Sequence, residues 1–248
     1  MDVLLLDLGL AAGFLGFLSL LKPLRFLGIG TPLTGALVML AGIALAACAA
    51  LLPTGPIHLK GPPMRIDEFI PVYQFGEHHE IRVHAPSERV YAAMRAVTAR
   101  EIRLFRLLTW LRSPHLPGPG RESLLNAPEA QPIIEVALRS GFHALAEEAP
   151  REVVFGALVC CDGARVASGE ALAAAHGPGL AKALMNFHLV DEGGGVTRVI
   201  TETRIFATDK SAERRFGLYW RIIYPGSALI RIMWLRAIRD RAERGPSA

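Results

Sequence analysis

Charged and aromatic residues are scarce in this chain of 248 residues, at 20% and 7% of the sequence. A typical soluble domain carries about 25% charged residues, whereas 51% of this sequence is hydrophobic. This balance excludes an intrinsically disordered protein, which would need low hydrophobicity and a high net charge. Three cysteines are also too few for a small domain built on disulfide bonds.

Charge is missing above all near the N-terminus, where residues 26–57 contain no Asp, Glu, Lys or Arg. Within this stretch, residues 33–52 could form a helix about 30 Å long, which matches the hydrocarbon core of a bilayer. Residues 3–21 are a second apolar run, with Asp7 near one end. We therefore predict that residues 1–53 anchor the chain as two transmembrane helices. The alternative is an interfacial helix followed by one span.

Basic residues near the two runs bear on their orientation. The positive-inside rule places the short loop with Lys22 and Arg25 in the cytoplasm. The following domain would then lie on the extracytoplasmic side of the cell membrane, a bacterial inner membrane. Lys60 and Arg65 favour the opposite orientation. Leu45–Cys48 also resembles a bacterial lipoprotein cleavage site, but the apolar run continues beyond it.

The composition changes again after the apolar runs. Proline and glycine recur over residues 54–64, which predicts an extended linker before a folded domain at 65–248. Residues 208–248 hold nine basic and four acidic residues, a net charge of +5. No nucleic-acid-binding pattern accompanies this charge, so nucleic acid is not an expected partner. Acidic lipid headgroups are the expected partner instead. The basic side chains that would contact them are Arg231, Arg236, Arg239 and Arg241. The alternative is that these arginines only solvate the outer face of the helix.

Hydrophobic periodicity predicts the order of elements in the folded domain. A strand is followed by two short helices, several antiparallel strands and a long C-terminal helix capped by Asp209, with a kink or break at Pro225–Gly226. The second short helix would pack through Leu104, Leu107, Leu108 and Leu111. The expected strands span residues 74–84, 141–146, 151–160, 181–191 and 196–207, and the long helix runs to about residue 244.

Two segments of this domain carry a resemblance to a known superfamily. Ile81–Val90 (IRVHAPSERV), and Thr201–Arg204 (TETR) leading into the long helix, resemble the START-like, helix-grip superfamily called SRPBCC. That superfamily includes polyketide cyclases, aromatase/cyclases and plant pathogenesis-related allergens. The resemblance covers residues 72–244. It implies an α+β fold in which an antiparallel sheet wraps around the C-terminal helix and holds a hydrophobic ligand.

The last predicted hairpin supplies the candidate ligand-binding residues. If Asp191 pairs with Val196 across the loop, one face of the hairpin is apolar apart from one carboxylate and one guanidinium, as is typical of small-molecule sites. The alternative is a surface salt bridge. This face carries Met185, Phe187, Leu189, Ile200, Glu202 and Arg204. Tyr219 and Trp220 lie on the inner stripe of the long helix, where we expect core packing or ligand contact.

Other reactive residues form no recognisable catalytic site. Glu77–Glu80 (EHHE) is a candidate metal cluster, but neighbouring residues of a strand point to opposite faces, so we interpret it as a solvent-exposed strand surface. Cys48, Cys160 and Cys161 have no histidine placed beside them and are expected to be structural. We expect no metal and no cofactor.

The predicted function is membrane-anchored binding of a hydrophobic or lipid-like small molecule without catalysis. One alternative is a cyclase or dehydratase acting on an aromatic polyketide-like substrate, with Glu202 as its acid–base group. The other is an interaction module at the membrane surface. The existence and lining of a cavity would distinguish between them.

Overall fold

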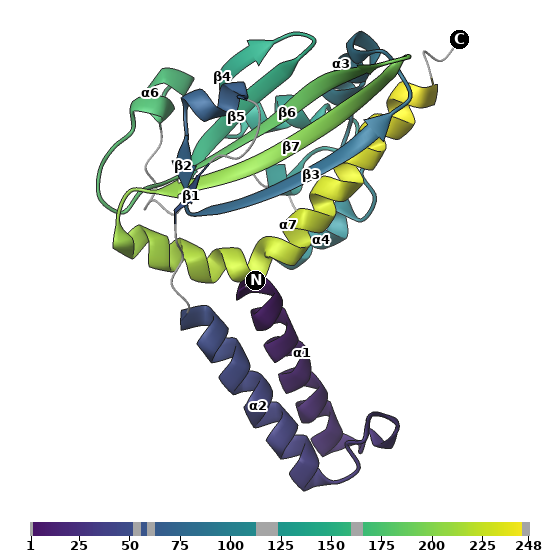
Figure 1. Ribbon diagram of the computed structural model, residues 1–248, viewed down its shortest axis with the longest axis vertical. Helices are drawn as coiled ribbons and strands as arrows, with labels where there is room; N and C mark the ends of the chain where they lie inside the picture. The colour runs from purple at the N-terminus through teal and green to yellow at the C-terminus, as the bar shows by residue number, and fades with distance from the viewer. Residues whose placement is uncertain (1, 52–55, 59–62, 113–123, 160–165, 245–248) are drawn as a thin grey trace. The chain divides into compact units, whose positions relative to one another are not determined.

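The computed structural model describes residues 2–51, 56–58, 63–112, 124–159 and 166–244 (Figure 1). The chain divides into two compact units. One unit contains the N-terminal helices together with residues 217–224, and the other contains the remaining domain. Cys160 and Cys161, and residues 54–55 and 59–62 of the expected linker, lie outside the described residues.

The N-terminal unit is a helical hairpin of α1 (Asp2–Leu21) and α2 (Pro32–Leu51), joined through the short turn η1 (Arg25–Leu27). Glycines allow the two backbones to approach closely, because a Cβ on Gly9 would lie 2.6 Å from the backbone nitrogen of Ala46. Large side chains such as Leu8 and Phe14 point outward and are more than half exposed. Both helices are long and apolar enough to cross a membrane. The two predicted apolar helices are therefore confirmed, each within one residue of the expected bounds.

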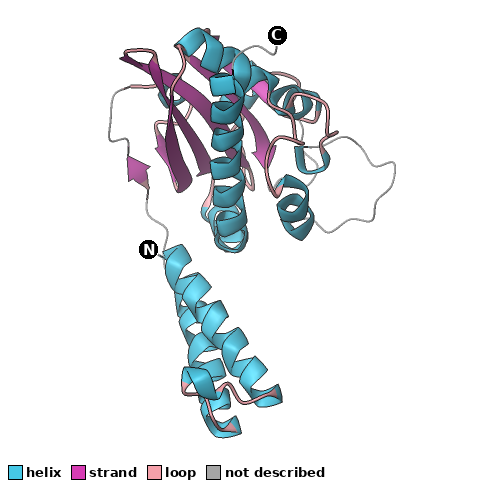
Figure 2. Cartoon of the chain, turned by 90° about the vertical axis from the view of Figure 1, so that its right-hand side faces the viewer, coloured by secondary structure: helices cyan, strands magenta, loops and turns pink. Residues whose placement is uncertain are grey.

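The other unit is built on a five-stranded antiparallel sheet in the order β3-β7-β6-β5-β4. The long helix α7 (Lys210–Arg244) packs on one face of this sheet, where Trp234 meets Phe187 (Figure 2). This arrangement confirms the predicted α+β class. The strands are β3 (Phe75–Val83), β4 (His143–Glu148), β5 (Glu152–Val159), β6 (Ala181–Gly193) and β7 (Val196–Ala207).

The two faces of the sheet carry separate cores. On the inner face, which faces α7, Phe155 and Phe187 pack with Trp234 and with the helices α3 (Ser87–Ala96) and α5 (Ile133–Arg139). On the outer face, Val154 and Leu184 pack with η2 (Arg65–Glu68) and α6 (Gly169–Ala174). The remaining elements are β1 (Ile57–His58), β2 (Val72–Tyr73), α4 (Phe105–Arg112) and η3 (Leu124–Asn126). Because strand residues alternate between faces, odd and even positions of β3, β6 and β7 belong to different cores.

The domain begins earlier than the sequence indicates. The expected linker at residues 54–64 contains β1, which pairs antiparallel with β2 through Ile57 and Tyr73. Met64 also packs against the outer-face core. Proline and glycine content predicts an extended backbone, but it does not show that an extended segment has a pairing partner.

The start of α7 agrees with its predicted cap. The Asp209 carboxylate accepts hydrogen bonds from the backbone N–H groups of Ser211 (2.7 Å) and Ala212 (2.9 Å). The helix then continues through Pro225, where a kink or break was expected. Figure 1 shows that the first two turns of α7 and the part after Pro225 run in different directions. The helix is therefore bent but not broken.

The packing stripe expected for the second short helix is wrong. In α4 the buried residues are Phe105 and Thr109, while Leu104 and Leu107 are more than half exposed. The helix begins at Phe105, because the turn after Thr98 continues to Leu104, which has a positive φ of 61°. Leu104 therefore lies outside the helix, and Phe105 and Thr109, which are four residues apart, form its buried side. The side chain of Leu111 lies outside the described residues.

The predicted pairing of the last hairpin is displaced by one residue. Asp191 pairs with Thr197 instead of Val196, and the register shifts between Asp191 and Gly193. Three consecutive glycines with φ between 61° and 80° close the loop in a conformation that other residues rarely adopt. A one-residue slip moves every side chain of one strand to the opposite face relative to the other strand. Met185 and Phe187 therefore share a face with Thr201 and Thr203, whereas Ile200, Glu202 and Arg204 lie on the outer face.

Candidate functional site

A cluster of buried polar side chains lies between the inner face of the sheet and α7. Strand β3 contributes Glu77 and His79, which alternate with exposed neighbours. Strand β7 contributes Thr203, and the part of α7 after Pro225 contributes Ser227 and Arg231. These elements meet because β3 and β7 are adjacent strands and α7 crosses the same face (Figure 2).

Glu77 is the centre of this cluster, and its side chain is only 1% exposed. Its Oε1 accepts hydrogen bonds from the hydroxyls of Thr203 (3.1 Å) and Ser227 (3.0 Å), and the Nε of Arg231 lies 3.6 Å away. Burial raises the pKa of Glu77, but His79, Arg231 and Ser227 outweigh that effect and bring the pKa below its ordinary value. The carboxylate is therefore charged at neutral pH despite its burial.

Arg231 is buried as well, and its guanidinium contacts a hydroxyl, a sulfur atom and two aromatic rings. Its Nη2 donates to the Thr203 hydroxyl at 2.9 Å and contacts the Met185 sulfur at 3.0 Å. The guanidinium lies 5.8 Å from the Phe187 ring centre and 5.4 Å from that of Trp234, within the range of cation–π attraction. The expectation that Arg231 contacts lipid headgroups is therefore wrong, because a buried carboxylate on a distant strand holds it in the core.

Two atoms of the cluster have no hydrogen-bond partner among the described residues. They are Oε2 of Glu77 and Nε2 of His79, which lie 3.7 Å apart. This distance is too long for a direct hydrogen bond, and buried polar atoms are rarely left without a partner. A hydroxyl placed beside both atoms could donate to the carboxylate and accept from the imidazole. The arrangement therefore suits a bound polar group.

The structure places the predicted ligand-binding residues in three separate regions. Met185 and Phe187 contact the cluster through Arg231. Tyr219 and Trp220 belong to the segment of α7 that groups with the N-terminal helices. There Trp220 is buried and meets the Tyr224 ring edge-on at 5.7 Å, while Tyr219 is 36% exposed.

The other three predicted residues, Ile200, Glu202 and Arg204, lie on the outer face. Arg204 is 1% exposed and donates to the carboxylates of Glu202 (2.6 Å) and Asp67 (2.6 Å) and to the backbone carbonyl of Ile70 (3.2 Å). The expected pairing of Glu202 with Arg204 is thus present, but it lies on the face opposite α7. There Arg204 connects β7 to η2 through its hydrogen bond to Asp67.

The interpretation of Glu77–Glu80 as a solvent-exposed strand surface is wrong for Glu77, and the sequence contains a signal for its burial. Alternation along residues 75–83 places Glu77 on the same face as Phe75 and Val83, both of which are buried. A carboxylate on the same strand face as core residues is expected to be buried, and a buried carboxylate requires a partner that compensates its charge. The partner itself, Arg231, follows 154 residues later on a helix, and no local pattern connects the two.

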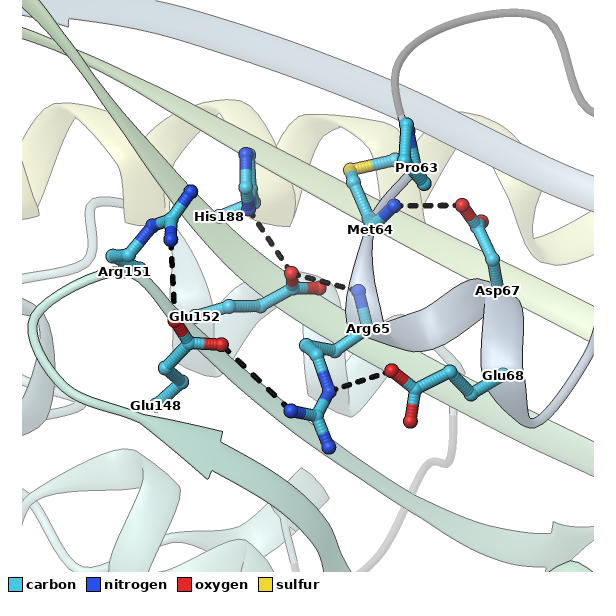
Figure 3. A pocket seen from close by; sticks show the side chains of 9 residues that line it. All are labelled: Pro63, Met64, Arg65, Asp67, Glu68, Glu148, Arg151, Glu152 and His188. Carbon is cyan, nitrogen blue, oxygen red and sulfur yellow. Dashed lines mark hydrogen bonds and ion pairs between the residues drawn. The ribbon is translucent and has the colours of Figure 1, made fainter.

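A pocket of about 330 Å³ opens on the outer face, between η2 and the turn joining β4 to β5 (Figure 3). At its base lies Glu152, which is 2% exposed. Its carboxylate accepts hydrogen bonds from the side chains of Asn186 (2.7 Å) and His188 (3.0 Å) and from the backbone N–H of Arg65 (2.9 Å). Burial raises the pKa of Glu152, but the hydrogen bonds from His188, Asn186 and the Arg65 backbone outweigh this effect and bring the pKa below its ordinary value. The group is therefore ionised at neutral pH. The lining consists of Pro63, Met64, Arg65, Asp67, Glu68, Glu148, Arg151, Glu152 and His188.

The chain was compared with known proteins. No protein-family model matches it, and the search of curated proteins found no match. Among solved structures, a conserved protein from Geobacillus kaustophilus is similar with a TM-score of 0.33 and 12% identity, over 68% of this chain and 96% of that one. A protein from Thermus thermophilus gives 0.28 and 14%, over 69% and 99%.

A third similar structure is the Zhui aromatase/cyclase from Streptomyces sp. R1128, with a TM-score of 0.26 and 12% identity, over 70% of this chain and 96% of that one. Likeness at this level carries no argument about a ligand or a reaction. The residues of this chain are therefore the basis for any statement about its function.

Proposed function

We propose that this protein is a membrane-anchored binding protein for a hydrophobic or lipid-like small molecule, held between the sheet and α7. The observation that carries the proposal is the pair of buried atoms Glu77 Oε2 and His79 Nε2, which face each other at 3.7 Å and have no hydrogen-bond partner among the described residues. They are surrounded by the apolar side chains of the inner core, which include Phe187 and Trp234. A mainly apolar site with a few convergent polar groups is the usual form of a small-molecule site.

The charges of the cluster restrict the polar group of the ligand. Oε1 of Glu77 is already occupied by Thr203, Ser227 and the charge of Arg231, so Oε2 is the remaining acceptor. An anionic carboxylate on the ligand would be repelled by Glu77. A hydroxyl both donates and accepts, and it would satisfy the carboxylate and the imidazole together. The proposed ligand is thus an apolar molecule with a hydroxyl group.

The position of the cluster on α7 offers a way for the ligand to enter. Ser227 follows the bend at Pro225 by two residues, and proline provides no N–H for the helical hydrogen-bond ladder. Movement of the helix after this bend would carry Ser227 and Arg231 away from Glu77 and make room for the ligand there. The ligand would enter there and restore the hydrogen bonds of the unpartnered atoms.

The apolar hairpin would supply the membrane anchor in this proposal. Its outward-facing side chains, such as Phe14 and Leu37, suit contact with lipid tails. A tether keeps the domain close to the bilayer and raises the effective concentration of a lipid-like ligand. We place the domain on the extracytoplasmic side, following Lys22 and Arg25. Alkaline phosphatase fused after Gly61 would then be active, and an active cytoplasmic reporter there would reverse the orientation.

The binding proposal is tested by identifying the molecules that co-purify with the full chain. Extracts of the wild type, Glu77→Gln and Glu80→Gln are compared by mass spectrometry. Glu80 is an exposed carboxylate on the same strand and serves as the matched control. We expect one hydroxyl-bearing apolar species to fall at least tenfold in Glu77→Gln and to be retained in Glu80→Gln. Equal amounts in all three proteins, or no such species in the wild type, would refute the proposal and leave an interaction module.

The alternative enzyme, with Glu202 as acid–base group, is not favoured. Glu202 lies on the outer face, where it accepts hydrogen bonds from Arg204 and lies 3.1 Å from Nδ1 of His78. A general acid or base must reach the substrate within hydrogen-bond distance, and the proposed ligand lies on the opposite side of the sheet.

A further inference from the structure

The pocket on the outer face contains an imidazole whose role the proposed function does not explain. We infer that this pocket is a second binding site, for a small organic cation with a primary ammonium group that donates a hydrogen bond to Nε2 of His188. The site is formed by the Glu152–His188 pair and by the charged residues at the pocket mouth (Figure 3).

The hydrogen bond of His188 fixes which of its nitrogens can accept. Nδ1 lies 3.0 Å from the carboxylate of Glu152, and an ionised carboxylate only accepts. Nδ1 therefore carries the proton, and Nε2 of the neutral ring has a lone pair. Nε2 has no hydrogen-bond partner among the residues the structure describes. Figure 3 shows the ring held at one edge by Glu152, with the other edge directed away from that carboxylate.

Glu152 makes this orientation rigid. Its carboxylate is held by Asn186, by the Arg65 backbone and by His188, so the imidazole is fixed by a group that is itself fixed. A carboxylate that orients an imidazole in this way sets the tautomer and the direction of the second nitrogen. The lone pair is thus positioned before any ligand arrives.

The charges around the pocket favour a cation over an anion. Four carboxylates line it, those of Asp67, Glu68, Glu148 and Glu152, and only two cations, those of Arg65 and Arg151. Arg204, which lies behind the lining, is shared between Asp67 and Glu202, so this pair of carboxylates is only half neutralised. Two negative charges therefore remain in excess around the pocket. An ammonium group would donate to His188 and be attracted by this excess.

The remaining lining selects a short apolar chain on the cation. Pro63 and Met64 form one wall, and Met64 also packs on the outer-face core. The volume of about 330 Å³ has room for a small molecule with several methylene groups beside its ammonium. A primary ammonium has three N–H donors, so it can donate one hydrogen bond to His188 and keep two for other acceptors.

The test uses the full chain in detergent, with histidine labelled by ¹⁵N, and butylammonium as the probe. Butanol and butyrate have the same apolar chain with a neutral and an anionic head. We expect saturable binding of butylammonium with a change in the Nε2 resonance of His188. Butanol should bind at least tenfold more weakly, and butyrate should not shift the resonance. No saturable shift with butylammonium, or an equal response to butyrate, would overturn the inference.

Two variants separate this site from structural effects. His188→Gln should weaken butylammonium binding at least tenfold, measured by titration calorimetry, and His176→Gln, on an exposed loop, should not. Glu148→Gln removes one carboxylate from the pocket mouth without changing the imidazole and should weaken binding about threefold or more. Unchanged affinity in both pocket variants would overturn the inference. Butylammonium binding and the co-purifying apolar species are measured separately on the wild type, so either proposal can fail while the other stands.

Discussion

The ion pair between Glu77 and Arg231 offers a direct test of the polar cluster. At 3.6 Å, and with an effective dielectric constant of about 20, two unit charges attract by about 4.6 kcal/mol. Removing one member leaves the other charged and buried, which typically costs about 3–5 kcal/mol. We therefore expect Glu77→Gln and Arg231→Met each to lower the free energy of unfolding by about that amount. The double variant should cost less than the sum of the two, because no unpaired charge remains.

The pH dependence of this effect follows from the lowered pKa of Glu77. A carboxyl whose pKa is lower in the folded state stabilises the fold above its unfolded pKa and loses this contribution as the pH falls. The difference in stability between the wild type and Glu77→Gln should thus be constant at neutral pH. It should shrink as the pH falls below about 4.5, the ordinary value for glutamate.

The measurement is urea denaturation of the full chain in detergent, followed by tryptophan fluorescence, to which Trp234 beside Arg231 contributes together with Trp110 and Trp220. Glu80→Gln is the control, because Glu80 and its partner Arg198 are 49% and 34% exposed and 3.4 Å apart. An exposed pair of this kind contributes less than about 1 kcal/mol. If Glu77→Gln costs no more than Glu80→Gln, or if the double variant is additive, the buried cluster is wrongly described.

Three further predictions concern other parts of the chain. Gly16→Ala should lower the melting temperature of the full chain, because the new Cβ would clash with the Met39 backbone. Gly13→Ala is the control and should be tolerated, because the nearest atom to its Cβ would be 3.8 Å away. Circular dichroism in detergent measures both melting temperatures. Arg204→Met should cost about 3–5 kcal/mol in urea denaturation, because it leaves carboxylates on η2 and β7 without their buried partner, and a cost under about 1 kcal/mol would contradict the description of that pair. Asp209→Ala should speed hydrogen exchange in the first turn of α7 and at Gly179, because the Asp209 carboxylate accepts hydrogen bonds from Ser211, Ala212 and the Gly179 N–H. Unchanged exchange in that turn would contradict the cap.

Local features of the fold were determined by the sequence alone. The apolar runs predicted α1 and α2 because hydrophobic composition over about twenty residues requires no knowledge of other segments. The alternation at residues 74–84 predicted β3, and Asp209 predicted the start of α7, because strand period and helix capping act over a few residues. These features held although the domain boundary and the stripe of α4 did not.

The candidate sites, by contrast, were decided by the tertiary structure. One extra residue at the glycine loop reversed the face of Glu202 relative to Phe187, because pairing register depends on the backbone dihedrals of the turn. Arg231 stood among solvated arginines in the sequence and became buried, because a carboxylate 154 positions earlier lies 3.6 Å away in the fold. Periodicity indicates which residues share a face within one element. Which charges meet across elements depends on packing, since the energy of a buried ion changes from a cost to a stabilising contribution only when its partner is within a few ångströms.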